Sequence, residues 1–498
     1  MSTKENASDL SRNLWLYLTA GAFWSCGLMA FFLVYNLYLL ELGYQEEVMG
    51  RISGAMTLGS LAFTFPASWL LNRFGANRII QAGVACTSLT LLLRALSENS
   101  WSLVLLAFTN GSTIAAWIVS TPPFLTQNVA PGFRSRAFSL SYGTSIGMGA
   151  ISGFAVGWIS RFLASSGNVP TGLSQLSIER MILVACAGCV FVAFMLVLLL
   201  REPPLCLATG KDDEDFVAPE NSLLGGERRL QPPDPSRQDN PPLHPSGGKE
   251  SSSSIAARLG RMDGSLPNSQ AESTRSSPSP QSGERAANGR VRGSWQGLFK
   301  GVQSRPFIAR LLVVLILWSL FVGSFSPFFN VFFHRQFNQS LAGIGIIFSL
   351  SQVCQLLAVL SMPWLVAKLG RVQAIASMQM LAAVFLPALL LTSKVQVAGL
   401  IYLTYLSFQV MSEPALENFI MDSVLPEERS LVSSLRYMIL FLMQAVSAWA
   451  TGLTIVRVGY SQLLIILAVL GLSASMAFYL SFRSGLGYSA GRNPHDQP

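Results

Sequence analysis

Charge is scarce in this 498-residue chain: Asp, Glu, Lys and Arg make up 12% of the residues, while 51% are apolar. A soluble protein of ordinary composition carries about twice that share of charge, because charged side chains cover its surface. The composition therefore excludes an ordinary soluble globular protein, a disordered chain and a coiled coil, and it favours a chain embedded in a lipid bilayer. The formal charge of +8 does not indicate nucleic-acid binding, since the basic residues are spread over short loops.

Cysteine and histidine are also rare, with six and three residues respectively. Five cysteines lie inside apolar runs, where they are expected to be small core residues rather than disulfides: Cys26, Cys86, Cys186, Cys189 and Cys354. The histidines are far apart and show no metal-ligand spacing, and no nucleotide-binding motif occurs. We therefore predict no metal site, no cofactor and no enzymatic activity.

Long apolar stretches dominate the rest of the chain, and a membrane-spanning helix needs roughly 20 mainly apolar residues. Twelve stretches meet this requirement: 13–40, 46–71, 78–97, 102–130, 137–163, 179–200, 307–334, 340–367, 372–393, 396–424, 430–456 and 461–481. The prediction is an all-α membrane protein with twelve transmembrane helices. Its expected divisions are a six-helix half at 1–200, a linker at 201–305, a second six-helix half at 306–485 and a tail at 486–498.

The segment between the two sets of helices has a different composition. It holds 12 of the 25 prolines, and its 14 Lys and Arg residues nearly balance 13 Asp and Glu residues. Such a segment buries too little apolar surface to offset the entropy of ordering it, which predicts a disordered linker. Orientation follows from the basic residues of the short loops, which number 11 on the side of the termini against 5 on the other side. Both termini are therefore predicted to be cytoplasmic.

The two halves align with each other at a single offset of 295 residues. The matched pairs are Gly50 and Gly345, Arg73 and Lys368, Gly75 and Gly370, Arg134 and Arg429, and Tyr142 and Tyr437. Because each half has an even number of helices, both halves enter the membrane from the same side and the repeat is parallel. Parallel six-helix halves related by an axis along the membrane normal are one architecture of secondary transporters, with the substrate near the midplane between the halves.

The chain resembles the major facilitator superfamily over nearly its whole length outside the linker, without pointing to one subfamily. The family signature between helices 2 and 3, G-x-x-x-D-R-x-G-R-[RK], is matched in part: Arg73 and Gly75 are kept, whereas Ser68 and Asn72 stand in place of the first glycine and the aspartate. The second copy contains Lys368, Gly370 and Arg371. In the family the acid of this loop contacts the start of helix 11, so the resemblance implies a weaker latch where Asn72 replaces it. Drug antiport is only weakly implied, since Phe154 replaces the proline of the exporters' helix 5 motif.

Ionisable residues inside a bilayer are costly and are therefore candidates for function. The stretch 396–424 is the richest, because Glu413 and Glu417 lie one helical turn apart beside Pro414. The rise per residue places Glu417 and Arg436 at similar depth, which predicts an ion pair. Two interpretations stay open: Glu413 carries a proton or contacts a substrate cation, or Glu417 and Arg436 form a buried gate while Glu413 meets a hydroxyl or water.

Other polar residues complete the predicted site. Candidate contacts for a substrate are Asn36, Asn330, Gln352, Gln355 and Gln444, against the alternative that they form hydrogen bonds between helices. Candidate charge partners at the membrane surface are Asp422, Lys368 and Arg371, together with Asn72 and Arg73. Arg94 is expected to extend toward the membrane surface from near the end of its helix.

These observations favour a monomeric secondary transporter of the cell membrane that works by alternating access. Its expected partners are the lipid bilayer, protons in one interpretation, and a small solute, neutral or amphipathic because the membrane segments hold few charges. The alternative is a non-transporting sensor or scaffold on the same fold that signals through the linker 201–305.

Overall fold

The structure is a computed structural model, and it describes residues 2–129, 133–165, 174–200 and 305–483. The predicted linker, apart from its last residue, and the predicted tail 486–498 lie outside the described residues. Within the described ranges the regular elements are all helices. The all-α prediction is therefore confirmed.

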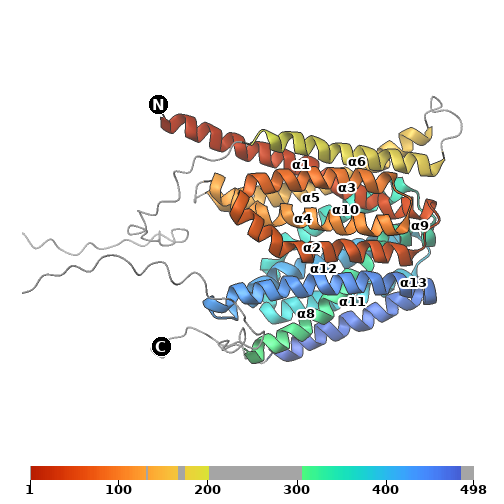
Figure 1. The fold of residues 1–498 in the computed structure, drawn as a ribbon. Helices are drawn as coiled ribbons and strands as arrows, with labels where there is room; N and C mark the ends of the chain where they lie inside the picture. The colour runs from red at the N-terminus through yellow and green to blue at the C-terminus, as the bar shows by residue number, and fades with distance from the viewer. Residues whose placement is uncertain (1, 130–132, 166–173, 201–304, 484–498) are drawn as a thin grey trace, which may run out of the picture. The chain divides into compact units, whose positions relative to one another are not determined.

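The first half of the chain forms six long helices (Figure 1). They are α1 (Ser2–Glu41), α2 (Glu46–Phe74), α3 (Ala76–Leu96), α4 (Ser100–Asn128), α5 (Arg134–Ser165) and α6 (Gln175–Leu198). Each of them corresponds to one of the six predicted spans. The bounds agree to within four residues, except that α1 begins 11 residues before the predicted start at 13. Long apolar stretches form helices in a bilayer because a helix satisfies its own backbone hydrogen bonds.

The second half contains six α-helices and three short 3-10 turns among its described residues. They are α8 (Arg305–Phe325), η3 (Ser326–Phe328), α9 (Phe329–Phe337), α10 (Leu341–Leu369), α11 (Arg371–Phe385), η4 (Pro387–Leu391), α12 (Val395–Asp422), η5 (Pro426–Glu428) and α13 (Arg429–Phe482). Eleven helices of the described chain are long and apolar enough to cross a membrane. One of these, Leu431–Phe482, holds two of the predicted spans, so the twelve-span layout is retained.

Two residues of the second half, Pro327 and Gly459, set the local course of the backbone. The predicted span 307–334 is interrupted at η3, because Pro327 lacks a backbone N–H and cannot continue the hydrogen bonding of α8. The chain turns within α13 at Gly459, inside the predicted loop between 456 and 461, and the φ of 83° and ψ of 174° of this glycine are not helical. Only glycine adopts such a conformation readily, which explains how two antiparallel spans follow each other so closely.

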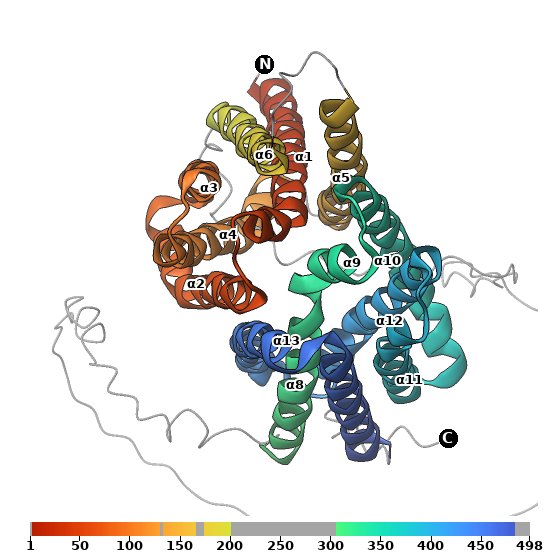
Figure 2. The same cartoon turned by 90° about the vertical axis from the view of Figure 1, so that its right-hand side faces the viewer.

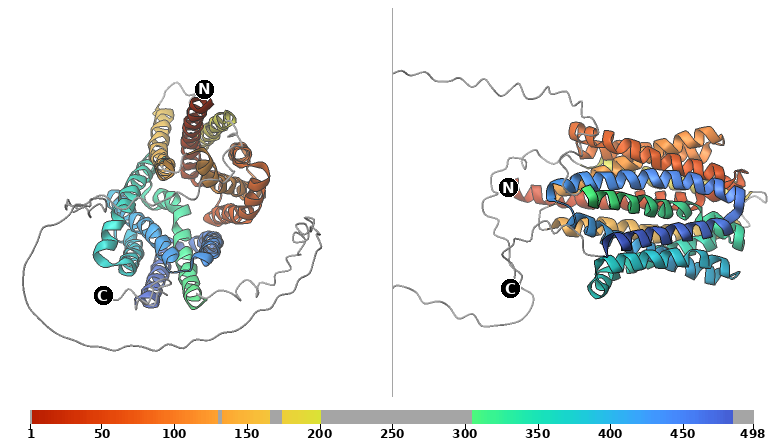
Figure 3. Two further views of the ribbon diagram at one scale, coloured as in Figure 1. Left: turned by 90° about the vertical axis from the view of Figure 1, so that its left-hand side faces the viewer. Right: turned by 90° about the horizontal axis from the view of Figure 1, so that it is seen from below.

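Both halves pack together in one compact unit. The start of α1 and the end of α13 lie on the same side, which is called the terminal side below; the other side is called the far side (Figure 1). Between the halves, α2 packs against α13 and α5 packs against α10, as the view from the far side shows (Figure 2). The same arrangement is seen from the terminal side in Figure 3.

The two contacts between the halves are related by the 295-residue repeat. Gly50 in α2 lies so close to α13 that a β-carbon there would come within 2.6 Å of the Ala448 carbonyl oxygen. The equivalent glycine of the second half, Gly345 in α10, lies equally close to Gly153 in α5, where a β-carbon would come within 2.7 Å of the Gly345 carbonyl oxygen. Small residues at these positions allow the backbones to approach, as is typical of helix contacts in membranes. The internal repeat is therefore a repeat of packing as well as of sequence.

Candidate functional site

A cavity of about 360 Å³ lies between the two halves. Its apolar wall includes Met29, Phe32, Leu33, Ile52, Met56, Val322, Phe329 and Phe348. Its polar and charged lining residues are Tyr35, Asn36, Ser53, Thr57, Arg94, Ser326, Gln409 and Gln444. The lining comes from α1, α2 and α3 of the first half and from α8, η3, α9, α10, α12 and α13 of the second, so a bound molecule contacts both halves at once.

Two asparagines close the far side of this cavity. Asn36 of α1 donates its side-chain amide to the Pro327 carbonyl oxygen at 2.5 Å. Asn330 of α9 donates its amide to the Leu33 carbonyl oxygen at 2.8 Å. The two bonds run in opposite directions between the halves, and only Asn36 also lines the cavity. The amides proposed from the sequence as substrate contacts therefore join the halves in this conformation.

An ion pair lies beside this closure. Glu46, the first residue of α2, is 2% exposed, and its Oε1 atom lies 3.2 Å from Nε of Arg335 in α9. The hydroxyl of Tyr460 in α13 donates to the same oxygen at 3.1 Å. Sequence reasoning missed this group, because charged residues at the ends of spans are ordinary and nothing in the spacing relates positions 46 and 335. We call Glu46, Arg335 and Tyr460 the far-side gate.

The carboxylates of α12 meet one guanidinium on the terminal side of the cavity. Arg436 of α13 donates from Nη1 to Glu417 at 2.6 Å and from Nη2 to Glu413 at 2.9 Å. The indole N–H of Trp318 in α8 donates to the other oxygen of Glu413 at 2.8 Å. The structure thus brings Glu417 and Arg436 together and adds Glu413 to the same group. We call Glu413, Glu417 and Arg436 the α12 triad.

The α12 triad and its partner Trp318 adjoin the cavity along two helices, α12 and α8. Gln409 lies one turn from Glu413 in α12, and Val322 lies one turn from Trp318 in α8; both line the cavity. Four residues of helix correspond to about 6 Å along the axis. Arg436 is 6% exposed, whereas Glu413 and Glu417 are 32% and 36% exposed. The two carboxylates are therefore accessible while the cation that they share is buried.

Arg94 occupies a different place from the one expected of it. Instead of extending to the membrane surface, it is 2% exposed and lines the cavity. Its guanidinium lies 4.1 Å from the centre of the Tyr35 ring and 5.2 Å from that of Phe31. Nη1 donates to Oδ1 of Asn110 in α4 at 3.2 Å. The expectation from the sequence was wrong because these aromatic and amide partners, which come from other helices, hold the cation inside.

The remaining predicted site residues lie outside the cavity, apart from Gln444, which lines it. Gln352 and Gln355 of α10 bond to each other at 3.0 Å. At the terminal side, Arg371 pairs with Asp422 at 2.5 Å, and the Lys368 ammonium lies 4.0 Å from the centre of the Trp364 ring. Asn72 and Arg73 are exposed at the end of α2, where the guanidinium of Arg73 lies over the rings of Trp69 and Phe74.

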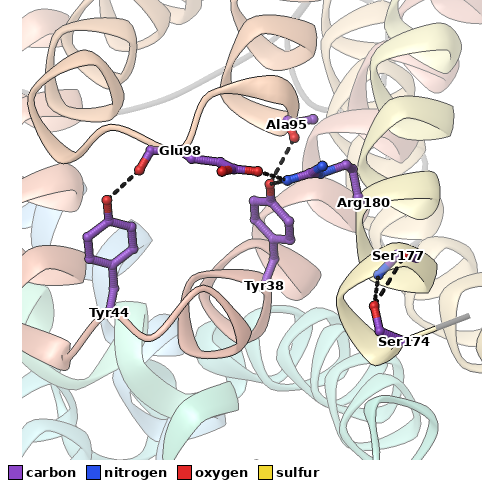
Figure 4. A network of polar contacts seen from close by, with 7 residues as sticks. All are labelled: Tyr38, Tyr44, Ala95, Glu98, Ser174, Ser177 and Arg180. Carbon is purple, nitrogen blue, oxygen red and sulfur yellow. Dashed lines mark hydrogen bonds and ion pairs between the residues drawn. The ribbon is translucent and has the colours of Figure 1, made fainter.

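A second polar network, called the Tyr38 network below, ties the far ends of α1, α3 and α6 within the first half (Figure 4). The hydroxyl of Tyr38 donates to the Ala95 carbonyl oxygen at 3.0 Å and accepts from Arg180 at 3.1 Å. Arg180 also pairs with the carboxylate of Glu98, and Tyr44 donates to the Glu98 backbone carbonyl. The network holds the first half together at the end that faces the far-side gate.

The sequence and the fold described above are matched by a known family. The model of the Major Facilitator Superfamily matches residues 15–424. The chain belongs to this superfamily. No curated protein matches its sequence. The chain is therefore an integral membrane protein with the fold of a secondary transporter, without assignment to a subfamily.

Solved transporter structures of the superfamily share this fold at low sequence identity. A bacterial homologue of the human lysosomal transporter Spinster, inward-facing and unoccupied, superimposes with a TM-score of 0.65 at 14% identity, over 96% of this chain and 97% of that one. The nucleoside transporter NupG gives 0.63 at 10% identity, over 95% and 99%. The inward-open xylose transporter XylE from E. coli gives 0.62 at 13% identity, over 98% of each chain.

Proposed function

We propose that this member of the superfamily moves a small amphipathic solute through the central cavity by alternating access, with transport coupled to protons. The observation that carries the proposal is the cavity itself, which is lined by both halves and is closed on the far side by contacts between them. A solute that contacts both halves favours the conformation in which both sets of contacts form. The lining of the cavity is partly apolar and partly polar, which suits a molecule with an apolar body and a few polar groups.

We further propose that the terminal side is cytoplasmic, which makes the conformation described above an inward-facing one. The support is the distribution of basic residues in the short loops, which favours the side of the termini. The far-side gate then faces the outside of the cell membrane. Solute release or entry on the cytoplasmic side passes the α12 triad.

The α12 triad is the proposed site of proton coupling. Two carboxylates share one guanidinium, so the group carries one excess negative charge when both are ionised. Protonation of Glu413 removes that excess and frees one arm of Arg436, while Glu417 keeps its partner. Because Gln409 and Gln444 line the cavity on the same two helices, a solute bound there acts on the same helices that hold the triad. Glu413 is the proposed proton carrier, and Glu417 with Arg436 is the proposed gate.

The experiment begins with purified protein and a panel of small solutes. A solute that binds the folded state raises the melting temperature. We expect at least one such solute to exchange across proteoliposomes that contain the protein, and we expect Glu413→Gln to remove the dependence of net uptake on pH while exchange continues. Asp422→Asn is the matched control, because Asp422 pairs with Arg371 at the exposed end of α12. Binding without any exchange would instead favour a non-transporting protein on the same fold.

A further inference from the structure

Arg94 is the one charged residue among the described residues that line the cavity. It is almost fully buried, and no Asp or Glu of the described chain lies within ion-pair distance of it. A buried cation without a carboxylate partner is costly, so such groups normally pair or serve a function. Arg94 is therefore a fixed positive charge at the wall of an otherwise uncharged cavity.

The partners that Arg94 does have leave most of its donors unused. A guanidinium has five N–H donors in a planar fork. The amide oxygen of Asn110 accepts from Nη1, and the buried Nε has no hydrogen-bond partner in the described structure. The rings of Phe31 and Tyr35 attract the cation through their faces. An oxyanion matches that fork, because two of its oxygens can accept from neighbouring donors.

The opposite half supplies a complementary polar atom. Gln409 of α12 lines the same cavity, is 5% exposed, and its Oε1 atom has no hydrogen-bond partner among the described residues. An unpartnered amide oxygen accepts from a hydroxyl or amine of a ligand. Met29 and Phe32 of the first half and Phe329 and Phe348 of the second supply apolar surface around these two polar groups.

We propose that the transported solute is an amphipathic organic monoanion, a carboxylate, whose anionic group binds Arg94 and whose apolar body fills the cavity between the halves. The inference rests on the proposed transport function and names the substrate class of that site. A single cation fits a single negative charge, whereas a polyanion would leave further charges without partners. A donor group on the solute reaches Gln409, so the same molecule connects the first half to the second.

The test compares matched carboxylates and amides on the purified full-length protein. The probes are benzoate, phenylacetate and octanoate, the corresponding neutral amides, and inorganic phosphate and chloride, with the melting temperature and the dissociation constant as readouts. We expect one or more carboxylates to stabilise the wild-type protein and the matched amide to bind at least about tenfold more weakly, which corresponds to about 1.4 kcal/mol. Arg94→Gln should lose the preference for the carboxylate, and Arg94→Lys should keep part of it.

Arg180→Gln is the matched control, because Arg180 belongs to the Tyr38 network and does not line the cavity. Arg94→Lys keeps the charge and guards against a variant that fails to fold. Equal binding of carboxylates and amides, or a preference that survives Arg94→Gln, would overturn the inference. The inference would also be overturned if phosphate or chloride stabilised the protein as strongly as the carboxylates do. It would be overturned as well if none of the anions stabilised the protein.

Transport is measured separately. Exchange of a neutral solute at the same rate in the wild type and in Arg94→Gln would support the transport proposal and contradict the anion site. Carboxylate binding that depends on Arg94, without exchange across proteoliposomes, would keep the site and contradict transport.

Discussion

Glu46 and Arg335 join the two halves of the molecule at the far side, with the carboxylate oxygen 3.2 Å from the guanidinium Nε. The carboxylate is buried, whereas Arg335 is 45% exposed. Tyr460 donates to the same oxygen, so the buried acid has two partners from the second half. The pair forms in the conformation described here, and opening of the far side requires that it separate. In the proposed alternating access, the far-side gate therefore contributes to the balance between conformations.

Removal of this ion pair should loosen the far side without unfolding the protein. Glu46→Gln keeps the shape of the side chain and removes its charge, and the loss of a half-exposed pair costs roughly 1 kcal/mol, or about a fivefold change in population. We expect backbone amides of α9 to exchange their hydrogens about fivefold faster in this variant. Glu47→Gln is the control, because Glu47 pairs with Arg51 within α2 and not with the second half. Equal exchange rates in the two variants would show that the pair does not hold the halves together.

Loss of the Arg436 cation alone should destabilise the protein more than loss of Arg436 together with the charge of Glu413. Arg436→Gln leaves Glu413 and Glu417 facing each other beside a buried neutral group, and breaking a buried pair on one side typically costs about 3–5 kcal/mol. Because the two carboxylates are partly exposed, we expect a smaller loss, about 2 kcal/mol. Adding Glu413→Gln should restore part of the stability, since one ionised acid then remains. Chemical denaturation in detergent measures the free energy of unfolding of the single and the double variants. If the losses caused by Arg436→Gln and Glu413→Gln simply add in the double variant, the two residues are not coupled.

Close packing at Gly50 should not tolerate a larger residue. A side chain there meets the backbone of α13, so Gly50→Leu forces α2 and α13 apart and should cost about 1–3 kcal/mol in the conformation that is closed on the far side. Gly147→Leu in α5 is the control, because a β-carbon at Gly147 meets nothing within 4 Å. The comparison uses the melting temperature and the hydrogen exchange of α13. Similar values for both variants would contradict close packing at this position.

Within the first half, the buried and exposed parts of the Tyr38 network should differ in their effect on stability. Tyr38→Phe leaves the Ala95 carbonyl and the Arg180 guanidinium without one partner each, and should cost about 1–2 kcal/mol in the free energy of unfolding. Glu98→Gln should cost less than about 1 kcal/mol, because Glu98 is 62% exposed and its ion pair is solvated. A larger loss in Glu98→Gln than in Tyr38→Phe would show that the ion pair, rather than the hydroxyl, holds the helix ends.

Much of the fold follows from the sequence because a bilayer makes apolar length decisive. The twelve predicted spans match the observed helices, and the 295-residue offset reappears at the ends of α2 and α10, where Gly75 and Gly370 share a φ of 82°. What hydropathy does not contain is local backbone geometry. It does not show the break at Pro327, which lies within an apolar stretch. It does place a boundary between 456 and 461, but it does not show the backbone conformation of Gly459 with which the chain turns there.

Contacts in the candidate site could be predicted only between residues on consecutive helices, where the position of each residue along its helix gives its depth in the membrane. Rise per residue is enough to place Glu417 near Arg436, and the structure contains that contact. The contacts of Arg94 with Tyr35 and Asn110, and of Glu46 with Arg335, join helices whose mutual placement no spacing in the sequence specifies. Arg94 therefore looks like a surface residue in the sequence and is a cavity residue in the fold.

The most direct test of alternating access measures both sides of the molecule at once. In a cysteine-free background, spin labels at Gln45 and Gln336 report the far side, and labels at Asn72 and Lys368 report the terminal side; all four positions are exposed. Pulsed electron paramagnetic resonance then compares the wild-type sequence with Glu46→Gln. Rocking of the halves about the cavity predicts that the variant gains a longer far-side distance and, in the same proportion, a shorter terminal-side distance. A far side that lengthens while the terminal side stays unchanged, or lengthens with it, would contradict alternating access.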